Sequence, residues 1–176
     1  MTHYFYVHFE EEDSLGIGYV KENVSFDLIS NIDVIHNWKP INILLKNGKN
    51  ADYLANDLGW RICSPKLRDI LDGGQGRKDI LQWLPVYVED TEQQSEFEYF
   101  VLIFPNNDDV IDREKSILAG KDSVVQAVLD MNKTSGHSVF SLPGEVTTLI
   151  VSKSVREAIE NAHCTGIEFS TVRMSV

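Results

Sequence analysis

The sequence holds little of what secreted, disulfide-bonded or membrane proteins need. Its two cysteines, Cys63 and Cys164, are too few for a disulfide framework and show no CxxC spacing, so we expect both to be small buried hydrophobes. No apolar run approaches the roughly 18 residues of a membrane span. Residues 1–7 carry neither a basic segment nor a small-residue cleavage site. We therefore expect a cytoplasmic protein.

Residue patterns that carry chemistry are missing as well. No G-x-S-x-G nucleophile motif is present, and the five histidines show no metal-ligand spacing: His3, His8, His36, His137 and His163. His137 falls in a predicted hairpin loop, where exposure is the default. These absences leave an enzyme hypothesis without a specific residue, and we expect no catalytic residue, no bound metal and no cofactor.

Two segments resemble binding loops only superficially. Residues 73–78, Gly-Gly-Gln-Gly-Arg-Lys, follow a predicted helix instead of opening one and lack the Gly-Lys-Ser/Thr ending of a phosphate loop. The acids of residues 108–114 lack the alternation and central glycine of a calcium-binding EF-hand loop. A flexible connection and an acidic loop describe the two segments better.

What is present is an ordinary globular composition with an uneven charge. The 176 residues are 43% hydrophobic and 24% charged, within the range of one domain, 1–176, with a real core. Of the 27 acidic residues, four lie in 10–13 and nine in 89–114, where Arg113 is the single base; the other 14 face 15 bases. Such acidic stretches repel nucleic-acid phosphates and anionic lipid, so we expect neither nucleic acid nor a membrane as partner. They attract a basic protein. The alternative interpretation is that both stretches are solvated loops that only keep the protein soluble.

The hydrophobic pattern predicts an α+β fold with mainly antiparallel strands and two or three flanking helices. Strands are expected over residues 3–9, 41–45, 84–88, 97–104, 124–129, 138–142, 147–151 and 167–172. Residues 105–121 are expected to be a polar loop. Pro85 predicts that its strand is at an edge or only beginning there. Ser64-Pro65 predicts a capped helix stopped by Gly73-Gly74, and Ser152 a second one to about residue 162.

The two predicted helix starts match each other without a gap. Residues 62–72 and 150–160 share the pattern Ile-x-Ser-x-x-(Leu/Val)-Arg-(Asp/Glu)-x-(Ile/Leu)-(Asp/Glu). Capping and amphipathic periodicity alone dictate several of these positions, but the arginine–acid pair goes beyond them. We therefore favour a weak internal duplication of a strand and a serine-capped helix. Arg68 and Arg156 are expected off the core face, near Asp72 and Glu160.

The order of these features resembles a known family. It comprises Ile62-x-Ser64-x-x-Leu67-Arg68-Asp69-Ile70-Leu71, Leu84-Pro85-Val86-x-Val88, a strand from Tyr99 to Phe104, Asp109-x-Ile111-Asp112-x-Glu114-x-Ser116, Val139-Phe140, Val151-Ser152-x-x-Val155-Arg156-Glu157-Ala158-Ile159 and Thr165-Gly166-Ile167-x-Phe169. Over residues 60–172 this is similar to a bacterial immunity-protein family, once filed as a domain of unknown function, whose genes lie beside polymorphic toxin genes. The resemblance implies a cytoplasmic antidote, without catalytic residues, that binds a cognate toxin domain. A basic nuclease is one such toxin, and families of this kind serve other toxin chemistries too.

The leading hypothesis is therefore an immunity protein that neutralises its toxin through an acidic surface. The candidate partner-binding residues are Glu10, Glu11, Glu12, Asp13, Glu89, Asp90, Glu92, Asp108, Asp109 and Asp112. Two alternatives stay open: a general intracellular interaction or regulatory module, and an enzyme whose site is assembled from dispersed carboxylates and histidines. The sequence leaves the oligomeric state and the toxin's activity undetermined.

Overall fold

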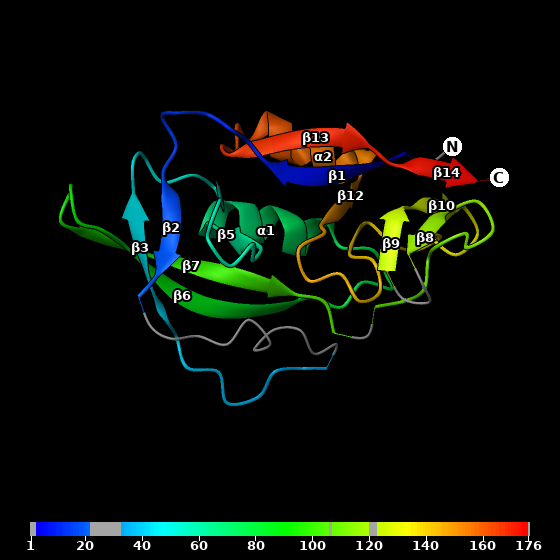
Figure 1. Ribbon diagram of the computed structural model, residues 1–176, viewed down its shortest axis with the longest axis horizontal. Helices are drawn as coiled ribbons and strands as arrows, with labels where there is room; N and C mark the ends of the chain where they lie inside the picture. The colour runs from blue at the N-terminus through cyan, green and yellow to red at the C-terminus, as the bar shows by residue number, and fades with distance from the viewer. Residues whose placement is uncertain (1–2, 22–32, 106, 120–122, 176) are drawn as a thin grey trace.

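The computed structural model describes residues 3–21, 33–105, 107–119 and 123–175 (Figure 1). The helices are α1 (Pro65–Gly74) and α2 (Lys153–Asn161). The strands are β1 (Tyr4–Phe9), β2 (Ile17–Val20), β3 (Asn42–Lys46), β4 (Tyr53–Leu54), β5 (Ile62–Cys63), β6 (Gln82–Asp90), β7 (Ser95–Ile103), β8 (Ile117–Ala119), β9 (Ser123–Gln126), β10 (Val128–Asp130), β11 (Val139–Phe140), β12 (Ile150–Ser152), β13 (Ile167–Thr171) and β14 (Arg173–Ser175).

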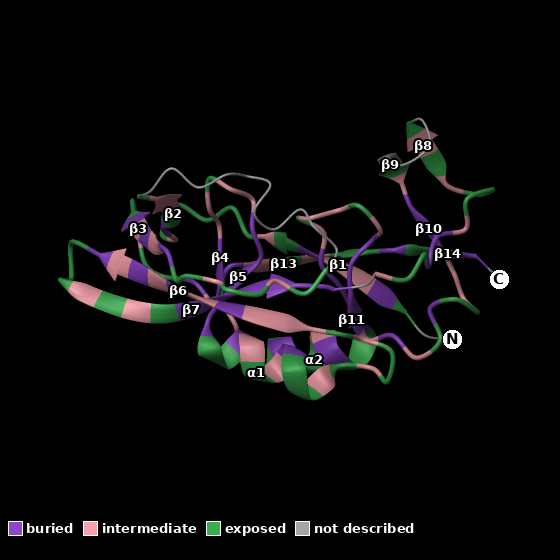
Figure 2. Ribbon diagram, turned by 90° about the horizontal axis from the view of Figure 1, so that it is seen from below, coloured by how far each residue is buried: buried purple, intermediate pink, exposed green. Residues whose placement is uncertain are grey.

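The strands form two large and two small sheets. The larger two have the orders β2-β3-β6-β7-β5-β4 and β11-β12-β1-β13, and the pairs β10–β14 and β8–β9 stand as two-stranded sheets. Among the described strands only β3–β6 and β10–β14 run parallel. The helices α1 and α2 lie side by side on one face of the molecule (Figure 2). The predicted α+β class, sheet-dominated and mainly antiparallel, is confirmed.

Helix α1 begins as its sequence predicts. The hydroxyl of Ser64 accepts a hydrogen bond from the backbone N–H of Leu67 at 3.2 Å, and Pro65 takes the first turn, where its missing N–H costs nothing. The predicted stop is slightly off, because both glycines belong to the helix. Gly74 has a packing reason: a Cβ there would come within 2.8 Å of Val155 on α2. The glycine lets the two helices approach closely.

Helix α2 differs from the prediction at its first residue. Ser152 occupies the N-cap position with extended backbone, but its hydroxyl lies 3.0 Å from the hydroxyl of Ser154 and makes no hydrogen bond to a first-turn amide. The prediction that both serines cap through their side chains is therefore right for Ser64 and wrong for Ser152. The expected packing face is present, since Val155 and Ile159 are buried.

The two matching segments occupy equivalent places in the two large sheets. Strands β5 and β6 are both antiparallel to β7, which lies between them, and α1 connects them. Strands β12 and β13 are both antiparallel to β1, which lies between them, and α2 connects them. Each half is thus a split β-α-β unit, with its central strand supplied from β7 in one case and from the N-terminus in the other.

The matched arginines also lie alike. The guanidinium of Arg68 stacks over the ring of Phe100 at 4.2 Å, and that of Arg156 over Phe5 at 4.4 Å. Phe100 is the cross-strand partner of the residue before the Ser64 cap, and Phe5 that of the residue before Ser152. Each arginine stacks on its own aromatic ring, a cation–π contact that needs no bound anion.

Their acidic neighbours differ between the two helices. Arg156 pairs with Glu160 at 2.8 Å, as predicted. Arg68 instead pairs with Asp69 at 2.7 Å, and Asp72 accepts a hydrogen bond from the indole N–H of Trp83. The predicted pairing of Arg68 with Asp72 is therefore not found among the described contacts, and Asp72 contacts Trp83 on β6 instead.

Three apolar clusters form the core. Alternate residues of β7 point to opposite faces, so Val101 joins the cluster on the face away from the helices while Leu102 packs under α1 and α2. Strand β1 divides in the same way, with Val7 toward the helices and Tyr4 toward the small sheets. The cluster that contains Leu102 and Val7 includes residues of both large sheets and both helices.

Three predictions about the strands are wrong. The single strand expected over residues 124–129 is divided between β9 and β10, which belong to different sheets. Strand β6 is internal, between β3 and β7, although Pro85 lies within it. The proline is tolerated because pairing with β3 starts only at Tyr87, and the Pro85 carbonyl accepts a hydrogen bond from the Trp38 indole at 2.8 Å. Residues 105–121 are not wholly loop, since β8 lies there and pairs with β9.

Candidate functional site

The first acidic stretch lines an open groove. Glu10, Glu11, Glu12 and Asp13 form the exposed loop between β1 and β2 and make one wall of the groove. The carboxylate of Glu12 accepts a hydrogen bond from the Ser14 hydroxyl. Within the described part of the chain the other three carboxylates have no hydrogen bond or ion pair. Three negative charges are therefore available to a partner.

The rest of this acidic groove includes apolar surface. Phe9, which stacks on Tyr53 at 4.5 Å, lines it together with Leu15 and the half-exposed Ile17. A carboxylate wall beside apolar surface suits a Lys or Arg side chain, because its aliphatic stem packs while its charge pairs. The groove can therefore bind a basic side chain of this kind.

The predicted residues of the β6–β7 hairpin have mixed roles. Asp90 is buried, and its carboxylate accepts hydrogen bonds from the backbone N–H groups of Glu92 and Gln93, so it organises the turn. Glu89 pairs with Lys21 at 2.5 Å. Glu92 is exposed at the tip of the hairpin. Of the three, only Glu92 is free to meet a partner without giving up an internal contact.

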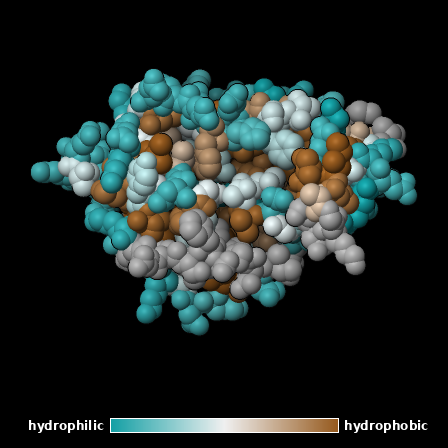
Figure 3. Space-filling model, viewed as in Figure 1, coloured by the Kyte–Doolittle hydropathy of each residue, from teal (hydrophilic) through white to brown (hydrophobic). Residues whose placement is uncertain are grey.

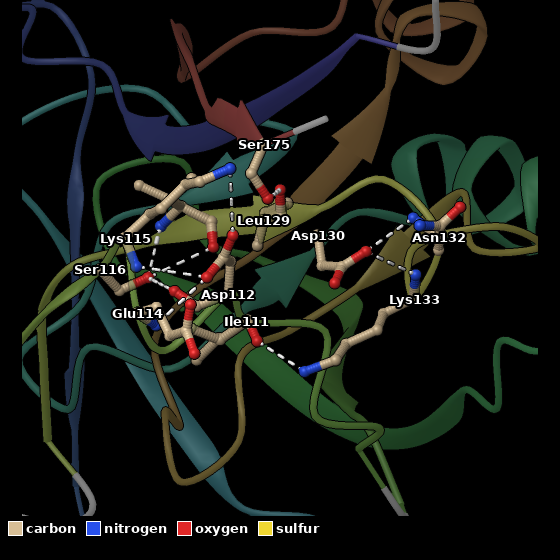
Figure 4. Close-up of polar contacts among 11 residues, drawn as sticks. Ile111, Asp112, Glu114, Lys115, Ser116, Leu129, Asp130, Asn132, Lys133 and Ser175 are labelled. Carbon is tan, nitrogen blue, oxygen red and sulfur yellow. Dashed lines mark hydrogen bonds and ion pairs between the residues drawn. The ribbon is translucent and has the colours of Figure 1, made fainter.

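The acidic loop, residues 108–114, makes hydrogen bonds and ion pairs with the rest of the structure, and Figure 4 shows those around Asp112. Asp112 accepts hydrogen bonds from the backbone N–H groups of Glu114 and Lys115, and a hydrogen bond with Ser175 is the main cause that lowers its pKa. Asp109 pairs with Arg113 at 2.9 Å and Asp108 lies 3.2 Å from His137. Asp108 and Asp109 still expose 59% and 42% of their side chains, whereas Asp112 exposes 17%. Asp112 is chiefly structural.

The structure separates acids that are continuous in sequence. Residues 89–98 cluster at the end of the large sheet where β6 turns into β7, and the acidic loop follows the other end of β7 (Figure 1). Strand β7 has nine residues, so about 30 Å separates the acids of the β6–β7 hairpin from the acidic loop. The register places the start of β2 and the end of β3 beside the hairpin end. The acidic groove therefore lies near the β6–β7 hairpin and far from the acidic loop.

One cluster of histidine and carboxylates does form. His137 is 7% exposed, and its ring nitrogens lie 2.8 Å from Asp79 and 3.2 Å from Asp108. Asp79 also accepts hydrogen bonds from the backbone N–H groups of Gly76, Ser138 and Val139. The prediction that His137 is exposed is wrong, because this network draws it inward. A cavity of about 10 Å³ beside this cluster has room for about one water, and His137 also lines an open groove of about 590 Å³ together with Gly136 and Ser138.

A buried arginine lies near this cluster in the core. Arg61 is 3% exposed, and burial lowers its pKa to about 10. Its guanidinium donates to the carbonyls of Leu102, Glu145 and Thr148 and to the Ser141 hydroxyl. These contacts tie residues 141–148 to the sheet. Because its donors are directed at internal acceptors, Arg61 does not form an open anion site.

The sequence prediction missed one exposed apolar feature. Five large hydrophobic residues are exposed in the described chain: Ile17, Val34, Ile80, Ile117 and Val125. Only Ile117 and Val125, 55% and 66% exposed, share an element, the β8–β9 hairpin. The available signal was the apolar run 117–119 facing 124–125 across Gly120-Lys121-Asp122, which is typical of a hairpin.

The described residues offer neither a metal site nor a membrane-spanning helix. The described residues contain no group of three or more His, Cys, Asp or Glu side chains placed to hold a metal ion. Neither described helix has the length and apolar character to cross a membrane.

Comparison with known proteins identifies the family. No curated protein matches the chain. The profile of the Imm11 immunity protein family matches residues 39–174, which includes the strands, both helices and the acidic loop of the region where the sequence resemblance was seen. The match extends that resemblance by about 20 residues toward the N-terminus and covers well over half of the chain. The chain therefore belongs to the Imm11 immunity protein family.

Proposed function

We propose that this protein is a cytoplasmic immunity protein that binds and neutralises a cognate toxin domain, with at least one acidic surface in the interface. Membership of an immunity family supports a toxin partner. The observation that carries the acidic interface is the placement of the charge. Residues 10–13 and 89–114 hold 13 of the 27 acidic residues against one base. Solubility needs no such segregation, whereas electrostatic steering does.

The charge implies the chemistry of the partner. An acidic surface accelerates encounter with a basic one and disfavours acidic competitors. A nuclease toxin carries a basic groove for phosphates, which an acidic inhibitor can cover. A toxin of another chemistry fits equally well if the surface around its active site is basic. The protein acts by occupying that surface, and its own residues perform no chemical step.

The internal contacts determine how the acidic surfaces must be tested. Replacing Asp112 would disturb its turn and its contact with Ser175 as well as remove charge. A groove variant (Glu10→Gln, Glu11→Gln, Asp13→Asn) and a loop variant (Asp108→Asn, Asp109→Asn, Glu114→Gln) each remove three charges. In the loop variant, the Asn residues keep an oxygen that can accept a hydrogen bond. A control on the helices (Asp69→Asn, Glu157→Gln, Glu160→Gln) removes the same charge elsewhere.

The first experiment tests neutralisation itself. Where the gene beside this one encodes a toxin domain, its co-expression with this protein should restore growth, and the two purified proteins should elute as one complex. Toxicity that persists, with no complex, would refute the proposed function.

The second experiment measures association rates across a salt series. We expect the groove or the loop variant to associate about tenfold more slowly than the wild type at low salt, with the difference fading toward high salt. Dissociation should change less, because charges at the rim of an interface act mainly on encounter. If both variants match the helix control, the acidic surfaces lie outside the interface.

A further inference from the structure

The β8–β9 hairpin is poorly integrated into the rest of the fold. Its strands pair only with each other, with a register irregularity after Ile117, and the hairpin projects from the body (Figure 2). Its outer edges pair with no other strand in the described chain. An isolated two-stranded hairpin is marginally stable in water, so its surface has no evident role in holding the fold.

This projecting hairpin carries exposed apolar surface. Ile117 and Val125 are the two most exposed large hydrophobic residues described, whereas Val124 packs inward against the core. Figure 3 shows a hydrophobic patch at the position of β9. Such a patch on a charged protein is typical of a contact surface.

A groove adjoins the hairpin. It has a volume of about 340 Å³ and lies between β9, β1 and residues 142–148. Tyr6 and Leu142 contribute apolar surface, and Glu145 and Arg173 contribute charge. A groove of this kind beside an apolar projection can receive a large side chain, which is how interface anchors are held.

We propose that the β8–β9 hairpin and this groove form the apolar anchor of the toxin interface, with the acidic loop as its charged rim. The inference rests on the proposed function and selects one of the two acidic surfaces. The acidic loop leads directly into β8, and Asp108, Asp109 and Glu114 expose carboxylates beside it. The matching toxin segment carries an apolar side chain flanked by Lys or Arg.

Charge also decides against a second copy of this chain as the occupant. The protein has a net charge of −11, and hairpin-to-hairpin contact would bring two acidic loops together. Like charges at an interface oppose association. A basic toxin surface gains from the same loop, so the toxin is the occupant that the charges favour.

The experiment uses the toxin domain that this protein neutralises in co-expression, catalytically inactivated and immobilised on a biosensor. The hairpin variant is Ile117→Glu with Val125→Glu. The matched control is Ile17→Glu with Val34→Glu, which adds the same charge at two other exposed apolar positions and challenges the acidic groove. We expect the hairpin variant to raise Kd at least 30-fold, mainly through faster dissociation, and the control to change Kd less than about threefold.

Further measurements separate folding and self-association from binding. A second variant, Ile117→Ala with Val125→Ala, should weaken binding in the same direction while near-ultraviolet circular dichroism stays native. If the wild type binds and the hairpin variant binds equally well, or only the Ile17 and Val34 variant loses affinity, the anchor is wrong and the proposed function stands. A wild type that does not bind refutes the proposed function instead. A wild-type dimer in sedimentation that the hairpin variant abolishes would assign the surface to self-association.

Discussion

Replacing Ser64 with alanine should destabilise the protein far more than replacing Ser152, although their sequence contexts match. The Ser64 hydroxyl accepts from the Leu67 N–H and donates to Asp52 at 2.6 Å. Losing a cap costs about 1 kcal/mol, and losing a hydrogen bond to a carboxylate about 1.5–3 kcal/mol. Because the two share one oxygen, we expect a total of about 2–3 kcal/mol. Among the described residues the Ser152 hydroxyl has only the Ser154 hydroxyl as a hydrogen-bond partner, so its loss should cost about 0.5 kcal/mol.

The assay is urea unfolding of both variants, followed by circular dichroism and supported by thermal unfolding. For a chain of this size the Ser64 variant should melt about 5–10 °C lower than the wild type. A double-mutant cycle with Asp52→Asn should show coupling of about 1 kcal/mol, because the two residues share a contact. Equal losses at Ser64 and Ser152, or no coupling to Asp52, would refute the reasoning.

Three further predictions concern buried and partly buried polar groups; Cys63 is buried as expected, whereas Cys164 is only partly buried. Burial disfavours the Asp52 carboxylate, but hydrogen bonds from Lys66, Ser64 and Thr165 outweigh it and lower its pKa. Its stabilisation is therefore present above the unfolded pKa and lost as pH falls through the folded one, so the cost of Asp52→Asn should shrink below about pH 4 in acid titrations. Replacing His137 with alanine should cost about 2–4 kcal/mol in urea unfolding, because the fully buried Asp79 carboxylate loses a partner; a loss under 0.5 kcal/mol would contradict this. Burial raises the pKa of Cys164 to about 11 and also that of Cys63, so a thiol reagent at pH 8 should label the native protein roughly 100-fold more slowly than the unfolded chain; fast native labelling would refute it.

Local signals in the sequence determined the elements whose causes are local. Serine before proline and apolar residues at helical spacing are enough to start α1, period-two alternation is enough to identify β1, and an apolar run identifies β7. The absence of catalytic and metal-ligand spacing, together with the ordered family features, was enough to point to an immunity protein. These inferences succeed because propensity and pattern act within about ten residues.

Tertiary structure decided what depends on contacts distant in sequence. Two nearly identical helix starts cap differently because Asp52 is beside Ser64, whereas no carboxylate in the described part of the chain accepts from the Ser152 hydroxyl. His137 is buried because its ring contacts the carboxylate of Asp79, a residue 58 positions away in the sequence. The acids of residues 89–114 belong to two surfaces because β7 runs between them. No window of sequence contains these partners, so only the folded chain could show which charges are free and which apolar residues remain exposed.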